Sequence, residues 1–305
     1  MKVVTIEAIQ NKESNPSLIK QVGFTLIELS IVLVIIGLIV GGVLVGQDLI
    51  KAAEIRSTIG QYEKYNASIN TFRTKYNGIP GDLVAASSTA FGLDPTAGAH
   101  AGTAGLGDGN GLIDGVGGAA ANQGLQWGEA LLFWQQLSVA TLVDGSYGTA
   151  ITTGGLAGAN LTGATMGTYL PPAKIGRGNY WSVGTDAAGS NYYVLGSLTA
   201  VTAATGVPVY ANSLTPIESY NIDSKLDDGN PNTGIVQARL YSYVTGPGPF
   251  GVLSGSNASA SGAADSATTY CTIGATATTT TNTYARNTSA GSGGTPNCIL
   301  RMRFN

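Results

Sequence analysis

The stretch Gly23-Phe24-Thr25-Leu26-Ile27-Glu28-Leu29 opens an apolar run that continues to Gly46 and decides the fold. No proline interrupts the run, and Glu28 is its only charged residue. At about 1.5 Å per residue, a helix over residues 24–46 covers the roughly 30 Å hydrocarbon core of a bilayer. A soluble core helix is rarely apolar on every face for this long. The sequence therefore predicts a transmembrane helix over residues 24–46.

The carboxylate of Glu28 is unusual inside such a segment. A charge in hydrocarbon costs roughly 2.5–3.5 kcal/mol on insertion scales, so it normally has a partner or a function. The run holds no Lys or Arg that could pair with Glu28. Cleavage after Gly23 would create an α-amine at Phe24, and that amine could pair with Glu28 of a neighbouring copy. The alternative is a carboxylate at headgroup level in contact with water, and both interpretations stay open.

Gly23 followed by Phe24-Thr25-Leu26-Ile27-Glu28 resembles the cleavage motif of type IV pilins and type II secretion pseudopilins. The resemblance is sharp over about residues 20–82 and loose beyond. In that family a membrane-embedded prepilin peptidase cuts after the glycine and N-methylates the new first residue. The resemblance implies cleavage between Gly23 and Phe24, methylation of Phe24, and a role for Glu28 in assembly. It implies as partners the peptidase, other pilin copies in a filament, and the inner-membrane assembly platform.

Residues 1–23 are then a prepilin leader. They are polar, contain Lys2, Lys12 and Lys20, and lack the apolar core of an ordinary secretory signal. The lysines predict a cytoplasmic leader, a single-pass inner-membrane protein and a periplasmic C-terminal head, which later enters a filament. Nothing in the sequence indicates the basic patch of a general nucleic-acid-binding protein.

Residues 47–78 continue the helix in an amphipathic form. Apolar residues recur at intervals of three and four, or sums of them, which is the spacing of a stripe packed on a domain. The end of the helix is marked by Gly78 as a left-handed cap and by Pro80, which bars continuation. The stripe consists of Ile55, Ile59, Tyr62, Ile69, Phe72 and Tyr76.

Residues 79–305 form the predicted globular head. Charged residues make up 11% of the chain, which contains 44 glycines, and this composition favours a β- and loop-rich extracytoplasmic domain. The predicted fold class is α+β: a long N-terminal helix packed on an antiparallel, pilin-like sheet with loop-rich insertions. Hydrophobic patterning predicts helices over 125–143 and 216–226, strands over 179–183, 191–198, 235–244 and 299–304, and part of a hairpin over 276–284.

The head contains the chain's two cysteines, Cys271 and Cys298. Because both lie in the half predicted to be translocated, we expect them to form a disulfide. Type IV pilins commonly close a C-terminal variable loop in this way. The pair would close the loop over residues 271–298.

Two groups of acidic residues are candidate cation sites. Asp108, Asn110 and Asp114 occupy positions 1, 3 and 7 of a loose calcium-loop pattern, but positions 5, 6 and 12 lack the expected residues. Asx-Gly turns alone also explain this composition. Asp223 and Asp227 share a helix face, for which a solvated helix end is the favoured interpretation. Calcium is therefore kept as a candidate ligand, and no other cofactor is expected.

The sequence offers no catalytic constellation. Its one histidine, His100, lies in a Gly/Ala-rich loop, and there is no P-loop, dinucleotide fingerprint or zinc cluster. We therefore expect a structural subunit, not an enzyme: a pilin or minor pilin or pseudopilin of a type IV pilus or a type II secretion pseudopilus. The alternative is a membrane-tethered or pilus-displayed binding protein or adhesin. The sequence does not distinguish a subunit of a pilus from a subunit of a secretion pseudopilus, nor a major subunit from a minor one.

Overall fold

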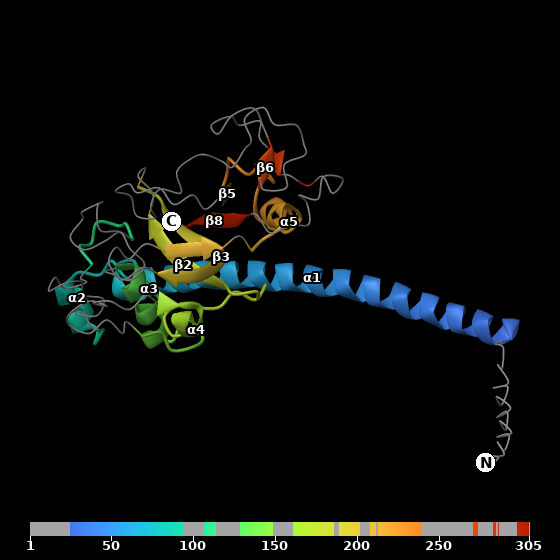
Figure 1. Ribbon diagram of the computed structural model, residues 1–305. Helices are drawn as coiled ribbons and strands as arrows, with labels where there is room; N and C mark the ends of the chain where they lie inside the picture. The colour runs from blue at the N-terminus through green and yellow to red at the C-terminus, as the bar shows by residue number, and fades with distance from the viewer. Residues whose placement is uncertain are drawn as a thin grey trace, which may run out of the picture. The chain divides into compact units, whose positions relative to one another are not determined.

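The structure is a computed structural model (Figure 1). It divides into two compact units, residues 1–49 and residues 50–305. Helix α1 (Leu26–Tyr76) begins in the first unit and ends in the second. The described residues are 25–93, 107–113, 129–148, 161–185, 189–201, 208–211, 213–239, 271–273, 283–284, 286 and 298–304.

The first unit contributes the apolar part of α1, up to Leu49. Its large aliphatic side chains are exposed on every side of the helix within the chain. Among the described residues, α1 is the one helix whose length and composition suit a membrane crossing. The apolar helix predicted over residues 24–46 is therefore present, with its first turn at Leu26.

In the second unit α1 is amphipathic, as predicted. Ile55, Tyr62, Ile69, Phe72 and Tyr76 are buried, and each lies three or four residues, or a sum of these, from the next. Tyr65, which the predicted stripe did not include, is buried with them.

The end of α1 differs from the prediction. Asn77, with φ 55°, takes the left-handed conformation that was assigned to Gly78. Asparagine tolerates this region because its short polar side chain can hydrogen-bond locally. A Cβ at Gly78 would lie 2.5 Å from Leu83 Cδ2, so the buried Leu83 side chain would have to shift to accept a larger residue there.

The head is built on an antiparallel six-stranded sheet whose hub is β3 (Asn191–Val201). The main order is β1-β3-β8-β5, and β2 and β4 also pair with β3. The predicted strands at 179, 191, 235 and 299 correspond to β2, β3, β5 and β8, and the α+β class is confirmed. The remaining strand bounds are β1 (Leu161–Thr162), β2 (Asn179–Thr185), β4 (Pro208–Ala211), β5 (Val236–Arg239) and β8 (Ile299–Phe304).

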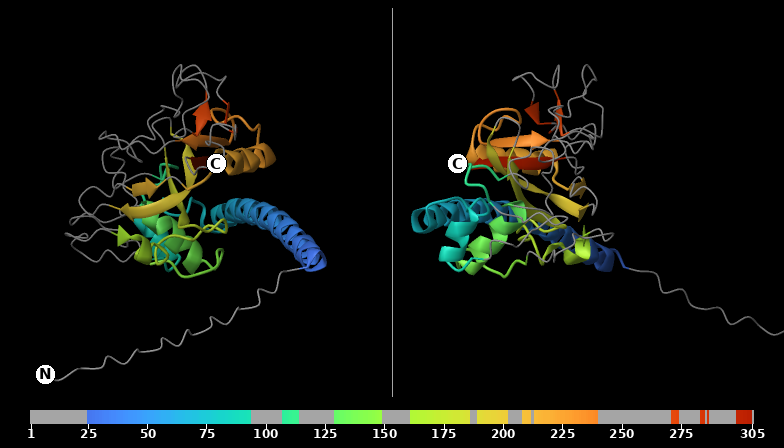
Figure 2. Two further views of the ribbon diagram at one scale, coloured as in Figure 1. Left: turned by 45° about the vertical axis from the view of Figure 1, so that its right-hand side comes forward. Right: turned by 90° about the vertical axis from the view of Figure 1, so that its left-hand side faces the viewer.

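Helices α1 and α3 (Glu129–Val139) lie beside the sheet (Figures 1 and 2), and an aromatic cluster joins them to it. The ring of Tyr193 on β3 lies 5.8 Å from that of Tyr62 and 6.1 Å from those of Tyr65 and Trp134. Trp134 belongs to α3, which packs against β2 and ends four residues before the predicted boundary at 143. The fully buried side chains of α3 confirm its prediction as a core helix.

Two side chains of α1 also fix the register of the helix on the sheet. Gln61 donates from Nε2 to Pro172 O at 3.1 Å and accepts at Oε1 from Lys174 N at 2.7 Å and Trp181 Nε1 at 3.2 Å. Tyr62 donates its hydroxyl to Arg303 O at 3.0 Å. A one-residue slip would rotate the helix by about 100° and break all four bonds.

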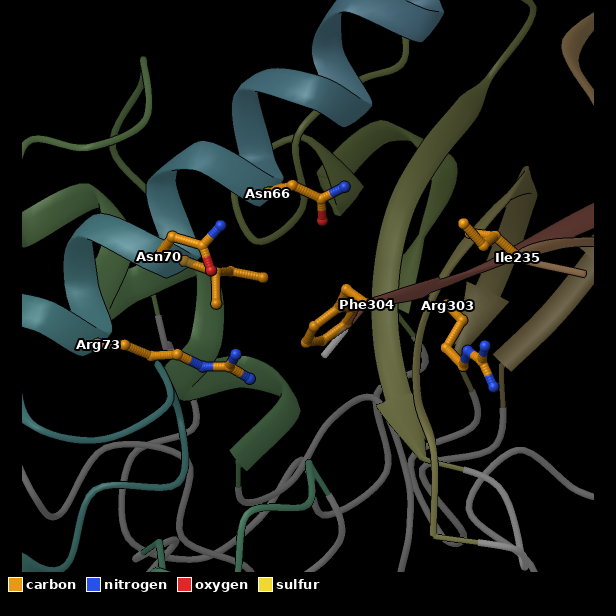
Figure 3. A pocket seen from close by; sticks show the side chains of 7 residues that line it. Asn66, Asn70, Arg73, Ile235, Arg303 and Phe304 are labelled. Carbon is orange, nitrogen blue, oxygen red and sulfur yellow. The ribbon is translucent and has the colours of Figure 1, made fainter. Parts of the chain in front are cut away.

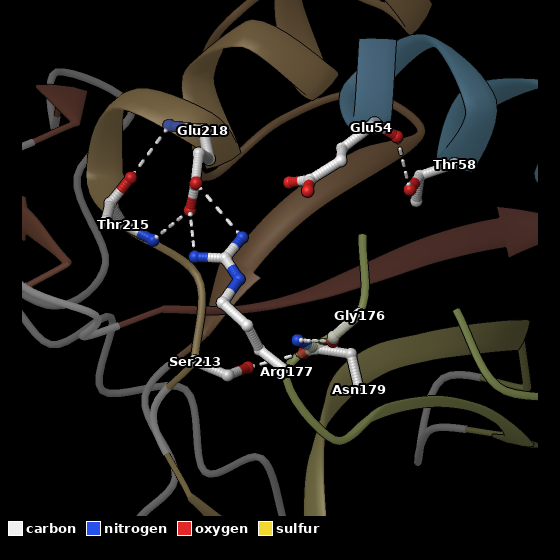
Figure 4. Close-up of polar contacts among 8 residues, drawn as sticks. All are labelled: Glu54, Thr58, Gly176, Arg177, Asn179, Ser213, Thr215 and Glu218. Atoms are coloured by element: carbon white, nitrogen blue, oxygen red, sulfur yellow. Dashed lines mark hydrogen bonds and ion pairs between the residues drawn. The ribbon is translucent and has the colours of Figure 1, made fainter. Parts of the chain in front are cut away.

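Helix α5 (Pro216–Leu226) begins where the Thr215-Pro216 pair predicts (Figure 4). Thr215 Oγ1 accepts from Glu218 N at 3.2 Å, and Glu218 Oε2 accepts from Thr215 N at 2.9 Å, which forms a capping box. The buried Glu218 carboxylate also pairs with both terminal nitrogens of Arg177. This bidentate pair attaches the helix start to the loop before β2.

The disulfide between Cys271 and Cys298 is present, with Cα atoms 5.0 Å apart. Cys298 bridges to Leu214 in the backbone and leads directly into β8. Of the predicted hairpin over 276–284, the structure describes β7 (Thr283–Tyr284), which pairs with β6 (Thr272–Ile273). Two short helices were not predicted, α2 (Ala85–Ala90) and α4 (Gly163–Met166).

We expect Cys271 and Cys298 to be oxidised in the cell. Thiol labelling of unreduced, denatured protein from the cell envelope should modify neither cysteine, and labelling after reduction should modify both. Replacing both by serine should lower the free energy of unfolding by roughly 3 kcal/mol, since the bond restricts the unfolded chain. Full labelling without reductant would contradict the pairing.

Candidate functional site

The segment Gly107–Ile113 is held against the head by three side chains. Asp82 accepts at its two carboxylate oxygens from Gly109 N and Gly111 N, both at 2.7 Å. Glu129 Oε1 accepts from Asp108 N at 3.2 Å. Asn191 accepts from Ile113 N and donates to Gly111 O, both at 2.8 Å. Buried acids and one amide therefore organise this segment by binding its backbone.

The predicted calcium ligands Asp108, Asn110 and Asp114 are only partly placed by the structure. Asp108 Oδ1 accepts from Asn110 N at 3.0 Å, and Asn110 Oδ1 accepts from Leu112 N at 2.7 Å. These are the Asx turns that the composition alone explains. Asp114 lies outside the described residues. The side chains of Asp108 and Asn110 are adjacent, since Asn110 Nδ2 donates to Asp108 Oδ2 at 3.0 Å.

A different acidic group forms around Asp108. One carboxylate oxygen each from Asp82, Asp108 and Glu129 lies within 4.8 Å of the others, and Asp82 and Glu129 are buried. Burial raises the pKa of the Asp82 carboxyl, and the amides of Gly111 and Gly109 oppose this rise. Calcium binding stays a prediction. Two residues of this group whose carboxylate oxygens suit calcium, Asp82 and Glu129, were not among the candidates from the sequence.

In the second acidic group, Asp223 does not lie at the solvated helix end that the sequence favoured, whereas Asp227 is half-buried and Asp228 is exposed. Asp223 is fully buried on α5, where it accepts from Tyr284 Oη at 2.7 Å and from Gly229 N at 3.1 Å. Burial is the main cause that raises the pKa of Asp223 to about 7, with Asp228 and Asp227 adding to the rise. Asp223 therefore connects α5 to β7, and β7 lies within the segment that the Cys271–Cys298 disulfide closes.

This carboxyl predicts a pH-dependent stability. Because the pKa of Asp223 in the folded chain lies above its unfolded value of about 3.9, the folded state takes up a proton that the unfolded state does not. We expect the melting temperature to rise by a few degrees as pH falls from 8 to 5.5. Asp223→Asn, which imitates the protonated acid, should flatten the profile over this range. An equal pH dependence in the variant would contradict the assignment.

The start of α1 carries a reciprocal cap. Thr25 donates from both its backbone N and its Oγ1 to Glu28 Oε2 at 2.8 Å, and Glu28 N donates to Thr25 Oγ1 at 3.3 Å. This is a capping box, which satisfies the first amides of a helix. The Thr25-x-x-Glu28 spacing is the sequence signal of such a cap, but the cap itself was not predicted. Glu28 therefore has a local role in addition to any role between copies.

Four glycines follow on the apolar helix. A Cβ added at Gly37, Gly41, Gly42 or Gly46 would meet no heavy atom within 4 Å. Their spacing allows close approach of another helix. In the described chain the apolar helix therefore has both exposed aliphatic side chains and glycine positions that no other residue covers.

Comparison with known proteins matches one family model, the prokaryotic N-terminal methylation motif, at residues 20–44. The chain carries the leader signature of type IV pilins and pseudopilins. Comparison with curated proteins and comparison with solved structures each returned no match.

The methylation motif supports a pilin-like or pseudopilin-like precursor. It implies processing by prepilin peptidase and assembly into a filament. The cleavage and methylation residues, Gly23 and Phe24, lie outside the described residues, whereas Glu28 lies on the first turn of α1.

Proposed function

We propose that the chain is a structural subunit, a pilin or a minor pilin or pseudopilin, of a type IV pilus or a type II secretion pseudopilus. In this proposal the peptidase cuts after Gly23, methylates Phe24, and releases a subunit that the inner-membrane platform adds to a filament. The observation that carries it is the methylation motif running directly into an exposed apolar helix.

The physical argument starts from the exposure of that helix. Apolar surface left in water costs about 25 cal/mol per Å². From Leu26 to Leu49 the side chains of α1 have no cover within the described chain, so they require either a bilayer or other helices. A filament subunit uses both in turn, first the membrane and then a bundle of neighbouring α1 helices.

The disulfide supports a periplasmic head, because such bonds persist in oxidising compartments. A cytoplasmic leader and a periplasmic C-terminal part give the chain a single-pass orientation. The role proposed is structural, not catalytic.

The test is a fractionation of cells that make the epitope-tagged chain at its native level. Mechanical shearing should release the chain with filaments in cells that have the assembly ATPase. Without the ATPase, the chain should remain in the inner-membrane fraction. If the sheared fraction lacks the chain while other subunits are present, the chain is a membrane-tethered protein and not a filament subunit.

A further inference from the structure

The sequence contains two Asn-Gly pairs, Asn77-Gly78 and Asn110-Gly111. In such a pair the backbone nitrogen of the glycine can attack the side-chain amide of the asparagine, because glycine has no Cβ that blocks the approach. Both asparagines are exposed, so water can reach both pairs. Their hydrogen bonds differ, however, and this difference selects one pair for reaction.

The reacting groups of Asn110-Gly111 are both held in place. Asn110 Nδ2 donates to Asp108 Oδ2 at 3.0 Å, and Asn110 Oδ1 accepts from Leu112 N at 2.7 Å. The attacking group, Gly111 N, donates to Asp82 Oδ2 at 2.7 Å. Hydrogen bonds to a carboxylate are stronger than those between neutral groups. Attack by the Gly111 nitrogen therefore requires that this segment first open locally, which protects the pair.

The pair Asn77-Gly78 follows the last turn of α1 and lacks such bonds. Asn77 N donates to Arg73 O at 2.9 Å, and the φ of 55° at Asn77 ends the helical conformation there. In the described part of the chain, neither the Asn77 side chain nor Gly78 N makes a hydrogen bond. Rotation about the Cα–C bond of Asn77 can bring Gly78 N towards Cγ, and this rotation breaks no hydrogen bond of either reacting group.

Two further asparagines on α1 provide a comparison within the same helix. Asn66 and Asn70 line a pocket of about 360 Å³ between α1 and the residues at the start of β5 and the end of β8 (Figure 3). The residues that follow them, Ala67 and Thr71, carry a Cβ and lie inside α1, where each amide donates to the carbonyl one turn earlier. Of these three asparagines, Asn77 is the one followed by an amide that is not held in the helix.

We propose that Asn77 is a site of spontaneous deamidation in the folded chain. The Gly78 nitrogen forms a bond to Asn77 Cγ, and the Cγ–Nδ2 bond breaks. Nδ2 leaves as ammonia with the proton that the Gly78 amide loses, and a five-membered succinimide ring remains. One water molecule then opens the ring: cleavage at Cγ gives aspartate, and cleavage at the main-chain carbonyl gives isoaspartate. Water is the one co-reactant.

Either product changes the chain at the end of α1. Each places a carboxylate near the C-terminal end of the helix, where the helix dipole disfavours a negative charge. Isoaspartate also lengthens the main chain by one carbon beside Gly78, where a Cβ would already lie 2.5 Å from Leu83 Cδ2. Because ammonia is lost to the solvent, the reaction does not reverse, and the modified fraction increases with the age of the protein. This inference does not depend on the proposed function.

The test compares the two pairs within one chain. The full chain in detergent is incubated in mildly alkaline buffer made with heavy-oxygen water, so that conversion during the later digestion carries no label. Peptide mass spectrometry should find labelled product at Asn77 at least about tenfold faster than at Asn110, because one protecting bond to a charged group accounts for that factor. Asn66 and Asn70 should remain amides. Asn77→Gln should remove the signal at this position and leave Asn110 unchanged, since the larger ring closes slowly.

The chain denatured in urea is the matched control for the effect of folding. There both pairs should convert at similar rates, because unfolding removes the bonds that protect Asn110. Equal conversion of the two pairs in the folded chain would overturn the proposal. It would also be overturned if Asn77 stayed intact in the folded chain while the denatured chain reacts. A difference that persists in urea would overturn it as well, because local sequence would then explain the selectivity.

Discussion

Replacement of Glu28 by alanine is expected to remove the chain from filaments while leaving it in the membrane. Insertion should be unchanged or improved, because the substitution deletes a carboxylate that costs roughly 2.5–3.5 kcal/mol in hydrocarbon. Docking should fail, because the Phe24 amine of an incoming subunit would be buried without a counter-charge. We expect the ratio of sheared to membrane-bound chain to fall by at least about tenfold, as for loss of a buried charge pair.

The capping box makes a second variant necessary. Glu28→Ala removes the local cap as well as the charge, whereas Glu28→Gln keeps an oxygen that can accept from Thr25. If charge pairing is the role of Glu28, the glutamine variant should fail as well. Thr25→Ala is the matched control, because it weakens the cap by about 1 kcal/mol and leaves the carboxylate. Wild-type incorporation of both Glu28 variants would show that the residue is only an interfacial carboxylate.

Gly23→Val is expected to block maturation. A peptidase that approaches the backbone closely at this position requires a residue without a large side chain. Mass spectrometry of the N-terminal peptide should find N-methylated Phe24 as the first residue of the wild-type chain. The variant should retain residues 1–23 and carry no methyl group.

The leader variant should also be excluded from filaments, because no free amine forms at Phe24. Val22→Ala is the control, since it changes the neighbouring side chain and leaves Gly23 in place. An unmethylated wild-type chain beginning at Met1, in cells with active peptidase, would refute the processing proposal. Normal cleavage of Gly23→Val would show only that the peptidase tolerates a branched residue.

Local signals explain which elements could be predicted. The apolar run, the stripe on α1 and the Thr215-Pro216 start of α5 depend on residues within one or two turns of each other. Short runs of apolar and aromatic residues similarly identified β2, β3 and β8, and alternation identified β5. These elements needed no knowledge of the rest of the chain.

The features that could not be predicted depend on pairs far apart in sequence. Asp82 and Glu129 meet beside Asp108 through tertiary packing, so a search for a contiguous calcium loop did not find them. Asp223 was expected at a solvated helix end, but Tyr284 buries and binds it. The pocket likewise requires α1 and β8 to be adjacent. Periodicity specifies which face of an element is apolar, not which element covers it.

The position of β8 in the sheet has a consequence for how the head matures. β8 comes last among the described strands in chain order, yet it lies between β3 and β5 and supplies Phe304 to the aromatic cluster. In the proposed orientation the leader stays in the cytoplasm and the head crosses the membrane from its α1 side towards its C-terminal end, so the sheet cannot close until β8 has crossed. The early strands therefore emerge as incomplete edges that need protection from other chains. Under the proposed localisation, completion of the head follows translocation of β8, so that translocation and folding are coupled.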